Sequence, residues 1–162
     1  MDRKLIDQYE AGGGALLRSI DGLTESDLLK VPPPDANVGK WSIQQIVIHL
    51  MDADLIWTSR MKCIIAEDHP QILGYDETKF AANLLYDRQD AKMAIQIFDL
   101  NRRQFARVLR KLPESAFTRT GHHNERGDIS LADSVQAIVQ HLDGHLKFIH
   151  KKRELFGKPI KK

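Results

Sequence analysis

The segment ISLADSVQAIVQHLDGHLKFIH, residues 129–150, contains the clearest structural signal in this chain. Its apolar side chains recur at steps of three and four residues, the spacing of one face of an α-helix. They are Leu131, Val135, Ile138, Leu142, Leu146 and Ile149. Ser130, followed by Asp133 three residues later, has the pattern of a helix N-terminal cap. The segment therefore predicts a long amphipathic helix that begins just after Ser130 and packs one face against other helices.

An earlier segment, GKWSIQQIVIHLMDAD at residues 39–54, predicts a second helix of the same kind. Ser42 and Gln45 form a capping-box pattern, and Trp41 is placed to pack on Ile46 across the first turn. The helical spacing of apolar residues continues beyond this segment, through Ile43, Val47, Leu50, Trp57, Met61 and Ile64. We therefore expect this helix to be about as long as the first.

Two further long helices are predicted near the N-terminus and in the middle of the chain. The same spacing links Ile6, Tyr9, Leu16 and Ile20, and then Ala94, Phe98, Asn101, Phe105, Val108 and Leu112. The N-terminal helix contains three consecutive glycines, residues 12–14, each costing on the order of 1 kcal/mol relative to alanine. We interpret them as a place where a neighbouring element packs closely. A short helix is expected after Thr24.

Four amphipathic helices in one chain predict an all-α fold, a four-helix bundle formed as a single domain over residues 1–162. No strand alternation is evident. A long connection, from about Glu67 to Asp90, joins the second and third helices, with one or two helical turns expected near Phe80 to Tyr86. Gly121 to Asp128 reads as a polar loop. Long connections in compact domains are often functional.

Charge and composition exclude several classes of partner. The net charge is only +2 over 162 residues and no basic stripe appears, which argues against a nucleic-acid partner. No segment has the length of a signal peptide's apolar region or of a membrane span, so we expect a soluble cytoplasmic protein. Cys63 is the only cysteine, and it cannot form an internal disulfide.

Histidines give the main indication of chemistry. His141 and His145 lie one helical turn apart, so their imidazoles leave the same helix face and can bind one metal ion. His49, on the second helix, would complete a set of three ligands with an open position, which is typical of catalytic metal sites. One such pair also arises easily by chance among seven histidines. His69 and His150 read as ordinary surface residues. His122 and His123, in the loop before the last helix, could edge a pocket but read more readily as solvated loop residues.

Asp54 and Asn101 interrupt otherwise apolar helix faces. A carboxylate in a core position is costly unless it is paired or faces a polar cavity. One interpretation pairs Asp54 with an arginine such as Arg60 or with a helix end, while Asn101 sets helix register. The other makes Asp54 a wall of the metal pocket, acting as a general base or orienting a ligand. The sequence is compatible with both interpretations of Asp54.

Taken together, these motifs resemble those of the DinB/YfiT-like superfamily. The resemblance rests on LIDQYEAG at residues 5–12 and on the two segments quoted above, and it covers about Leu5 to Phe156. It implies a bundle that binds a divalent metal, often zinc or nickel, through His49, His141 and His145, commonly as a homodimer. Many relatives carry a further histidine where this chain has Gly144.

The resemblance also implies a range of activities. Relatives include transferases that use a low-molecular-weight thiol, a thiol-dependent isomerase, and proteins described as metal-dependent hydrolases. We therefore expect an enzyme acting on a small-molecule substrate, in which the ion activates a water or a thiol. The alternative is a non-catalytic bundle, either a metal-stabilised homodimer or a small-molecule sensor in stress response.

Overall fold

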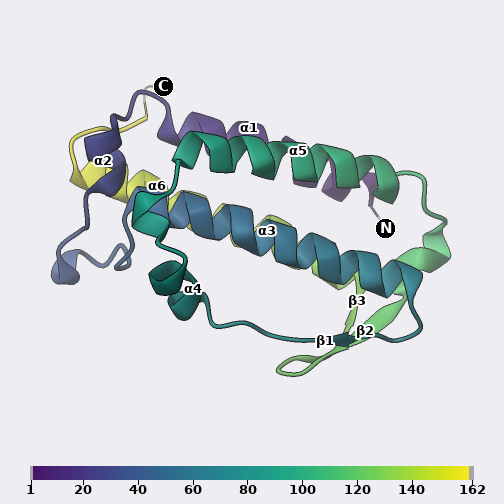
Figure 1. The fold of residues 1–162 in the computed structure, drawn as a ribbon. Coiled ribbons are helices and arrows are strands. Elements are labelled where there is room, and N and C mark those ends of the chain that lie inside the picture. The colour runs from purple at the N-terminus through teal and green to yellow at the C-terminus, as the bar shows by residue number, and fades with distance from the viewer. Residues whose placement is uncertain (1, 161–162) are drawn as a thin grey trace.

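A computed structural model describes residues 2–160, and the prediction of one domain over 1–162 extends at positions 1, 161 and 162 beyond the described residues. Four long helices form the bundle: α1 (Arg3–Ile20), α3 (Ile43–Ala66), α5 (Ala91–Leu109) and α6 (Leu131–Leu155). Figure 1 shows them as two layers, with α1 and α5 above α3 and α6. The predicted helix bundle is confirmed. Within the described residues, no helix is both long enough and apolar enough to cross a membrane.

The predicted helix starts agree with the structure. Ser42 and Gln45 form a complete capping box at the start of α3, and Ser130 and Asp133 do the same for α6. The short helix after Thr24 is α2 (Glu25–Leu29), also with a complete capping box. Side chains that accept hydrogen bonds from the first backbone N–H groups satisfy donors that a helix leaves free. These helix starts are therefore encoded locally.

The four long helices have an uncommon connectivity. Both α1 and α3 pack against α5 and α6, so α1 lies diagonally across the bundle from α3. In Figure 1, α3 and α5 run in the same direction, and α1 and α6 run in the opposite one. Two neighbouring helices that run in parallel need a connection that returns along their whole length. This requirement explains the long segment between α3 and α5.

The returning segment contains short elements rather than a structureless loop. It begins with β1 (Gln71–Ile72), continues through α4 (Glu77–Asn83) and ends in the 3₁₀ turn η2 (Tyr86–Arg88). Figure 1 shows α4 beside α3, so this segment covers one side of the bundle. Two further 3₁₀ turns, η1 (Pro34–Ala36) and η3 (Glu114–Thr118), lie in the other connections.

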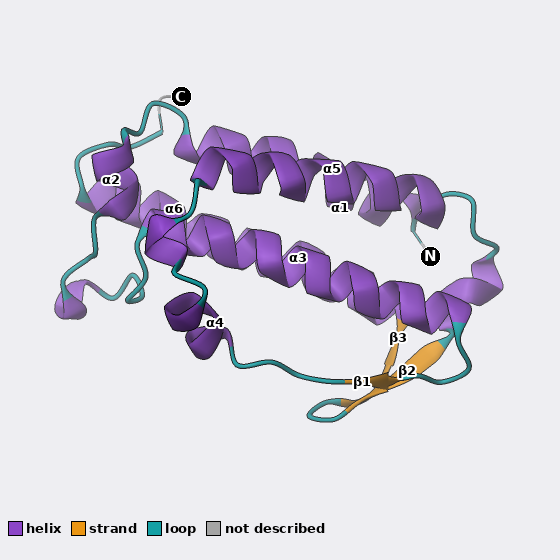
Figure 2. Ribbon diagram, in the orientation of Figure 1, coloured by secondary structure: helices purple, strands orange, loops and turns teal. Residues whose placement is uncertain are grey.

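The prediction of a polar loop at Gly121–Asp128 was wrong. This region forms the antiparallel hairpin of β2 (Thr120–His123) and β3 (Gly127–Ser130), and β1 pairs with β2 in parallel to make a small sheet (Figure 2). Gly121 and His123 are buried on β2 whereas His122 is only partly so, but this alternation involves no apolar side chain. Hydrophobic spacing therefore gave no sign of the strand.

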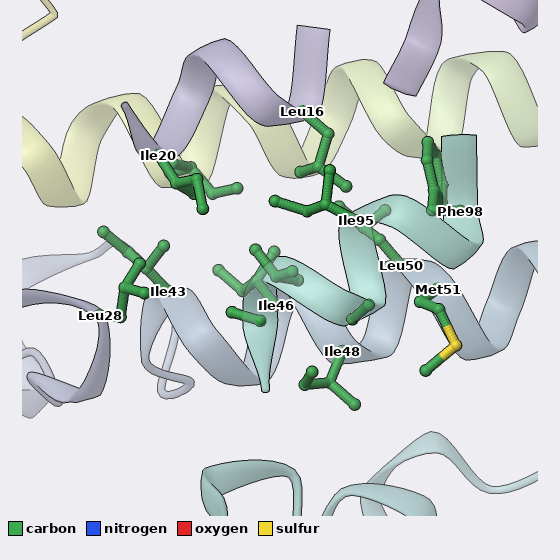
Figure 3. Close-up of a cluster of buried hydrophobic side chains, with 14 of the residues drawn as sticks. Leu16, Ile20, Leu28, Ile43, Ile46, Ile48, Leu50, Met51, Ile95 and Phe98 are labelled. Carbon is green, nitrogen blue, oxygen red and sulfur yellow. The ribbon is translucent and has the colours of Figure 1, made fainter. Parts of the chain in front are cut away.

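The core forms where the helix faces meet. Figure 3 shows Leu16 and Ile20 of α1, Ile46 and Leu50 of α3, and Phe98 of α5 among a cluster of buried apolar side chains. A second cluster includes Tyr9, Phe105 and Leu131. Burying one apolar side chain of this size stabilises the folded state by roughly 1.5–3 kcal/mol relative to leaving it exposed to water. These contacts fix the spacing of α3 and α6, which carry the histidines.

Candidate metal centre

His49 is the seventh residue of α3, close to the helix start that Ser42 fixes. Its side chain is 1% exposed, and the Trp41 ring lies against it with ring centroids 4.9 Å apart. His141 and His145 project from the middle of α6 and are partly buried. Because α3 and α6 are neighbours in the bundle, all three imidazoles meet between them.

The three rings converge through the same atom. The Nε2 atom of His141 lies 3.1 Å from that of His49 and 3.1 Å from that of His145. Two nitrogens that bind one ion at about 2.0–2.1 Å, at angles between octahedral and tetrahedral, lie roughly 2.9–3.4 Å apart. The spacing of the histidine nitrogens is therefore that of a metal-ligand set.

Hydrogen bonding alone does not account for this arrangement. A nitrogen of a neutral imidazole has either one hydrogen or one lone pair, so the Nε2 atom of His141 can form only one of its two contacts as a hydrogen bond. A cation at the centre would accept a lone pair from all three nitrogens. The residues present therefore fit a divalent ion.

The protonation of the cluster also suits ligation. Burial lowers the pKa of His49 to about 3, with further lowering by the neighbouring His141 and His145. Burial lowers the pKa of His141 to about 4, with contributions from His145, Arg102 and Arg126, and burial lowers the pKa of His145. Neutral histidine is the form that binds metal ions. At neutral pH all three side chains are thus ready to act as ligands.

The other ring nitrogens of the cluster differ from those of many metal sites. Histidine ligands usually donate their second N–H to a carboxylate or carbonyl, which fixes the ring. Among residues 2–160, the Nδ1 atoms of His49, His141 and His145 are buried and have no protein partner. Packing, such as the contact of Trp41 with His49, therefore orients these rings.

A pocket of about 360 Å³ opens beside the cluster. Its walls come from the loop before α3, from the start of α4 and from α6: Val38, Gly39, Lys40, Trp41, Ile46, Glu77, Thr78, His145, Phe148 and Lys152. A larger hollow of about 500 Å³, on the surface between α1 and α5, contains none of the three histidines. The pocket at His145 can therefore present a substrate to the site.

Two charged residues of this pocket were not predicted from the sequence. The Oε2 atom of Glu77 lies 3.8 Å from the Nε2 atom of His49. Lys152 is fully buried and donates hydrogen bonds to the carbonyls of Val38 and Gly39, and burial lowers its pKa to about 8. Lys152 thereby ties α6 to the loop before α3. Glu77 reaches the site only because the connection after α3 returns along the bundle.

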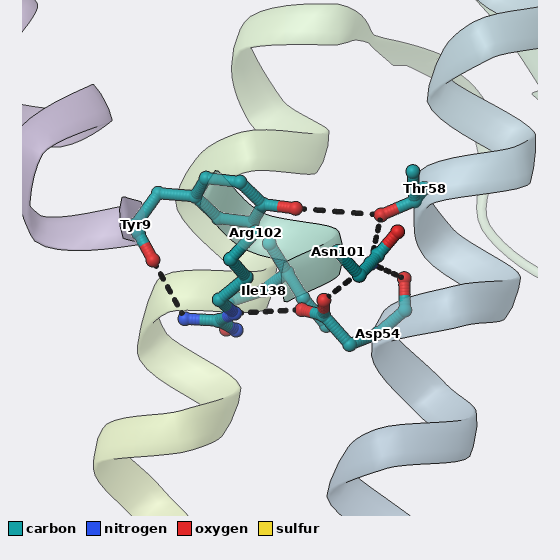
Figure 4. A network of polar contacts seen from close by, with 6 residues as sticks. All are labelled: Tyr9, Asp54, Thr58, Asn101, Arg102 and Ile138. Atoms are coloured by element: carbon teal, nitrogen blue, oxygen red, sulfur yellow. Dashed lines mark hydrogen bonds and ion pairs between the residues drawn. The ribbon is translucent and has the colours of Figure 1, made fainter. Parts of the chain in front are cut away.

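Asp54 lies in a different network from the histidines (Figure 4). Its Oδ1 atom accepts a hydrogen bond from Nε of Arg102 at 2.8 Å, and its Oδ2 atom accepts one from Asn101 at 2.7 Å. Burial raises the pKa of Asp54, an effect that Arg102 and Asn101 oppose. Asp54 is therefore paired with an arginine, as one of the two interpretations expected, but the arginine is Arg102 and not Arg60. Among the described residues, Asp54 is not part of the cluster of potential metal ligands formed by His49, His141 and His145.

Arg102 connects this network to the rest of the bundle. It is 1% exposed and donates hydrogen bonds to the carbonyls of Tyr9 on α1 and Ile138 on α6. A signal for its burial exists in the sequence, because Arg102 follows Phe98 by four residues and precedes Phe105 by three.

The remaining histidines lie elsewhere. His69 and His122 are half-exposed near Asp128 at the hairpin, and His150 is exposed on α6. His123 is instead 2% exposed, which corrects its reading as a solvated residue. Its ring stacks on Trp57, and its Nδ1 atom accepts a hydrogen bond from the backbone of Glu125. We interpret His123 as part of the packing of the hairpin.

Fold and site together define a four-helix bundle with a candidate three-histidine metal centre at the edge of a pocket. The family model of the DinB superfamily matches residues 8–149, and this chain belongs to that superfamily. The resemblance inferred from the sequence is therefore confirmed.

Two similar proteins illustrate the relationship, and both carry the name "Putative metal-dependent hydrolase". One, from Oceanobacillus iheyensis, is 30% identical over 112 residues, which are 68% of this chain and 64% of that protein. The other, from Bacillus mycoides, is 26% identical over 155 residues, 93% of this chain and 84% of that protein. This chain thus matches less than two-thirds of the length of the first relative.

A solved structure supports the fold. YfiT from Bacillus subtilis, described as "a probable metal-dependent hydrolase with an unusual four-helix bundle topology", superimposes with a TM-score of 0.87 at 23% identity. The match covers 95% of this chain and 86% of that one. The connectivity described above is therefore shared with a solved member of this structural class.

Proposed function

We propose that this chain is a metal-dependent hydrolase of a small-molecule substrate, with a divalent ion held by His49, His141 and His145. The observation that carries the proposal is the convergence of three neutral Nε2 atoms at ligand spacing. Zinc or nickel is the ion we expect, as the family resemblance implies, and imidazole nitrogen suits both. The names of the two relatives support hydrolysis as the reaction class.

The bound ion would supply Lewis acidity, which polarises a substrate oxygen and lowers the pKa of a water or thiol at the open position. The chain's own residues would do the rest. Trp41 and Phe148 offer apolar surface in the pocket, where the non-reacting part of an ester or amide can bind. His145 lies in the pocket wall, so the acyl carbon of a substrate held there would lie near the cluster.

Thiol transfer is the second reaction this donor set can support. Cys63 is not part of the histidine cluster, so a reactive sulfur would come from a low-molecular-weight thiol cosubstrate. The two reactions are separated with cobalt-substituted protein. Added 2-mercaptoethanol should change the cobalt absorption spectrum if a thiol is a substrate, and it should leave the spectrum unchanged if the nucleophile is water.

The metal assignment is tested by elemental analysis of untagged protein after loading with zinc or nickel. We expect about one ion per chain in wild type, and its loss in His49→Ala and in His141→Ala. His150→Ala is the matched control, because His150 is exposed on the same helix as His141 and should not affect the metal content. Wild type without metal would refute the proposal, as would retention of metal in both ligand variants.

A non-catalytic bundle is the remaining alternative. It predicts that the ligand variants lose stability or change oligomeric state, while no small molecule alters the cobalt spectrum. A spectrum that responds to an acyl analogue such as acetohydroxamic acid, together with hydrolysis of p-nitrophenyl acetate, would exclude a purely structural metal.

A further inference from the structure

We propose that Glu77 is the general base of this site, the side chain that takes the proton from the attacking water. The inference rests on the proposed metal-dependent hydrolysis and adds a catalytic residue to it. Glu77 is the first residue of α4, within the long connection that returns along the bundle.

Glu77 lies on the same side of the histidine cluster as the pocket. Its Oε2 atom is 3.8 Å from the Nε2 atom of His49, the nitrogen that faces the centre of the cluster. It also lines the pocket together with His145. A water or an acyl group that entered this pocket would therefore meet the Glu77 carboxylate and the open side of the histidines together.

The distances between Glu77 and the three histidines show that its carboxylate lies next to the predicted metal ligands but is not one of them. Two ligands bound to one ion at roughly 2.0–2.2 Å can be separated by at most about 4.4 Å. The donor atoms of His49, His141 and His145 all lie within 4.8 Å of one another, and the Glu77 carboxylate does not belong to this group. In this conformation Glu77 is therefore positioned to contact a molecule at the open side, and it is not a fourth ligand.

Two other acidic side chains, both on α3, are engaged by hydrogen bonds. Both oxygens of Asp54 accept hydrogen bonds, from Arg102 and Asn101. Asp52 accepts a hydrogen bond from the Tyr86 hydroxyl at 2.6 Å. Within residues 2–160, the carboxylate of Glu77 approaches only the neutral ring of His49, at 3.8 Å, and its side chain is 60% exposed. Unlike these two carboxylates, Glu77 is therefore free to exchange a proton with a substrate water.

The proposed step balances without a further reactant. The water gives one proton to Oε2 of Glu77 while its oxygen forms a bond to the acyl carbon. The bond from that carbon to the leaving nitrogen or oxygen then breaks, and Glu77 passes the proton to the leaving atom. No electrons are transferred, and the carboxylate is regenerated. General base catalysis of this kind typically contributes 10²–10⁴-fold to the rate.

Glu77→Gln tests the assignment, because it preserves shape and removes the proton acceptor. Glu25→Gln is a matched control, since Glu25 is the first residue of the short helix α2 and lies outside the pocket. We expect Glu77→Gln to bind zinc or cobalt as wild type does. We also expect it to hydrolyse p-nitrophenyl acetate with a kcat at least 100-fold lower, while Glu25→Gln matches wild type.

A second measurement does not depend on turnover. Acetohydroxamic acid must lose a proton to bind a metal ion, and a neighbouring carboxylate can accept it. Titration of the cobalt-substituted protein, followed by visible absorption, should therefore show binding at least 10-fold weaker in Glu77→Gln than in Glu25→Gln.

The outcomes separate this inference from the proposed function. Loss of metal in Glu77→Gln would overturn the base assignment in favour of a ligand role and would leave the metal centre intact as a proposal. Unchanged kcat and hydroxamate affinity in a metal-loaded Glu77→Gln would overturn the base assignment outright. A wild type that binds no metal would remove both proposals at once.

Discussion

At the scale of single residues, burial of the histidine cluster links its protonation to folding. The pKa of His49 is about 3 in the folded protein, compared with an ordinary value of 6.5. Between these values the unfolded chain binds a proton that the folded protein does not bind. The folded state is therefore favoured at pH 7 and progressively loses this advantage as the pH falls below 6.5.

We predict that the free energy of unfolding of the metal-free protein falls on acidification by about 1.4 kcal/mol per pH unit for one such histidine. Urea unfolding at pH 7, 6 and 5 measures this dependence. His49→Asn should show a shallower decrease. Equal slopes in wild type and variant would contradict the linkage to His49.

The glycines of α1 give a matched pair of substitutions. A Cβ atom on Gly12 would lie 2.3 Å from Nη1 of Arg102 and 2.8 Å from a methyl of Leu142, both buried in the bundle. A Cβ atom on Gly14 would meet only the end of the Arg18 side chain, at 3.2 Å. The expectation of close packing at these glycines therefore holds for Gly12, and also for Gly13, where a Cβ atom would lie 2.2 Å from Oδ1 of Asp99.

We predict that Gly12→Ala destabilises the fold by about 1–3 kcal/mol, because the added methyl group would overlap the buried side chains of Arg102 and Leu142 and force them to move. Gly14→Ala should instead be neutral or stabilise by up to about 1 kcal/mol, since alanine is the better helix former. Thermal unfolding of both variants measures the difference. A Gly12→Ala protein as stable as Gly14→Ala would show that Arg102 moves aside freely.

At the scale of elements, one polar network joins all four long helices. Asp54 and Thr58 of α3, Asn101 and Arg102 of α5, Tyr9 of α1 and the Ile138 carbonyl of α6 are connected by hydrogen bonds (Figure 4). Arg102 also lies over the rings of Tyr9 and Phe98. Removing one partner of a buried ion pair leaves an uncompensated charge, which is strongly unfavourable.

We predict that Asp54→Ala destabilises the protein by about 3–5 kcal/mol and leaves metal bound per folded chain unchanged. Asp143→Ala, at an exposed position of α6, is the control and should have little effect. Denaturant unfolding and elemental analysis measure the two quantities. Loss of metal from a folded Asp54→Ala protein would instead favour the earlier interpretation of Asp54 as a wall of the metal pocket.

At the scale of the whole molecule, the homodimer implied by the family resemblance stays a prediction. Helix α5 has three exposed apolar side chains at positions i, i+4 and i+7: Met93 is 59% exposed, Ile97 38% and Leu100 62%. We expect light scattering to give twice the chain mass of 18.5 kDa. Leu100→Glu should shift the protein towards monomer, and a wild-type monomer at micromolar concentration would refute the prediction.

The local parts of this structure follow from the sequence alone. The caps at Ser42 and Ser130 involve residues three positions apart, and the helix faces repeat over one or two turns. The pairing of His141 with His145 is likewise a property of a single helix. These features depend on short-range backbone geometry, so a linear pattern is sufficient to predict them.

Tertiary structure decided which other residues accompany the three predicted histidines at the site. The parallel arrangement of α3 and α5 forces the connection to return along the bundle, and only this return brings Glu77 to His49. Packing of α5 between α1 and α3 likewise turned Asp54 towards Arg102, 48 residues away. Contacts between distant segments depend on how whole helices pack. Their energy is spread over many buried side chains, so no local motif records which partners will meet.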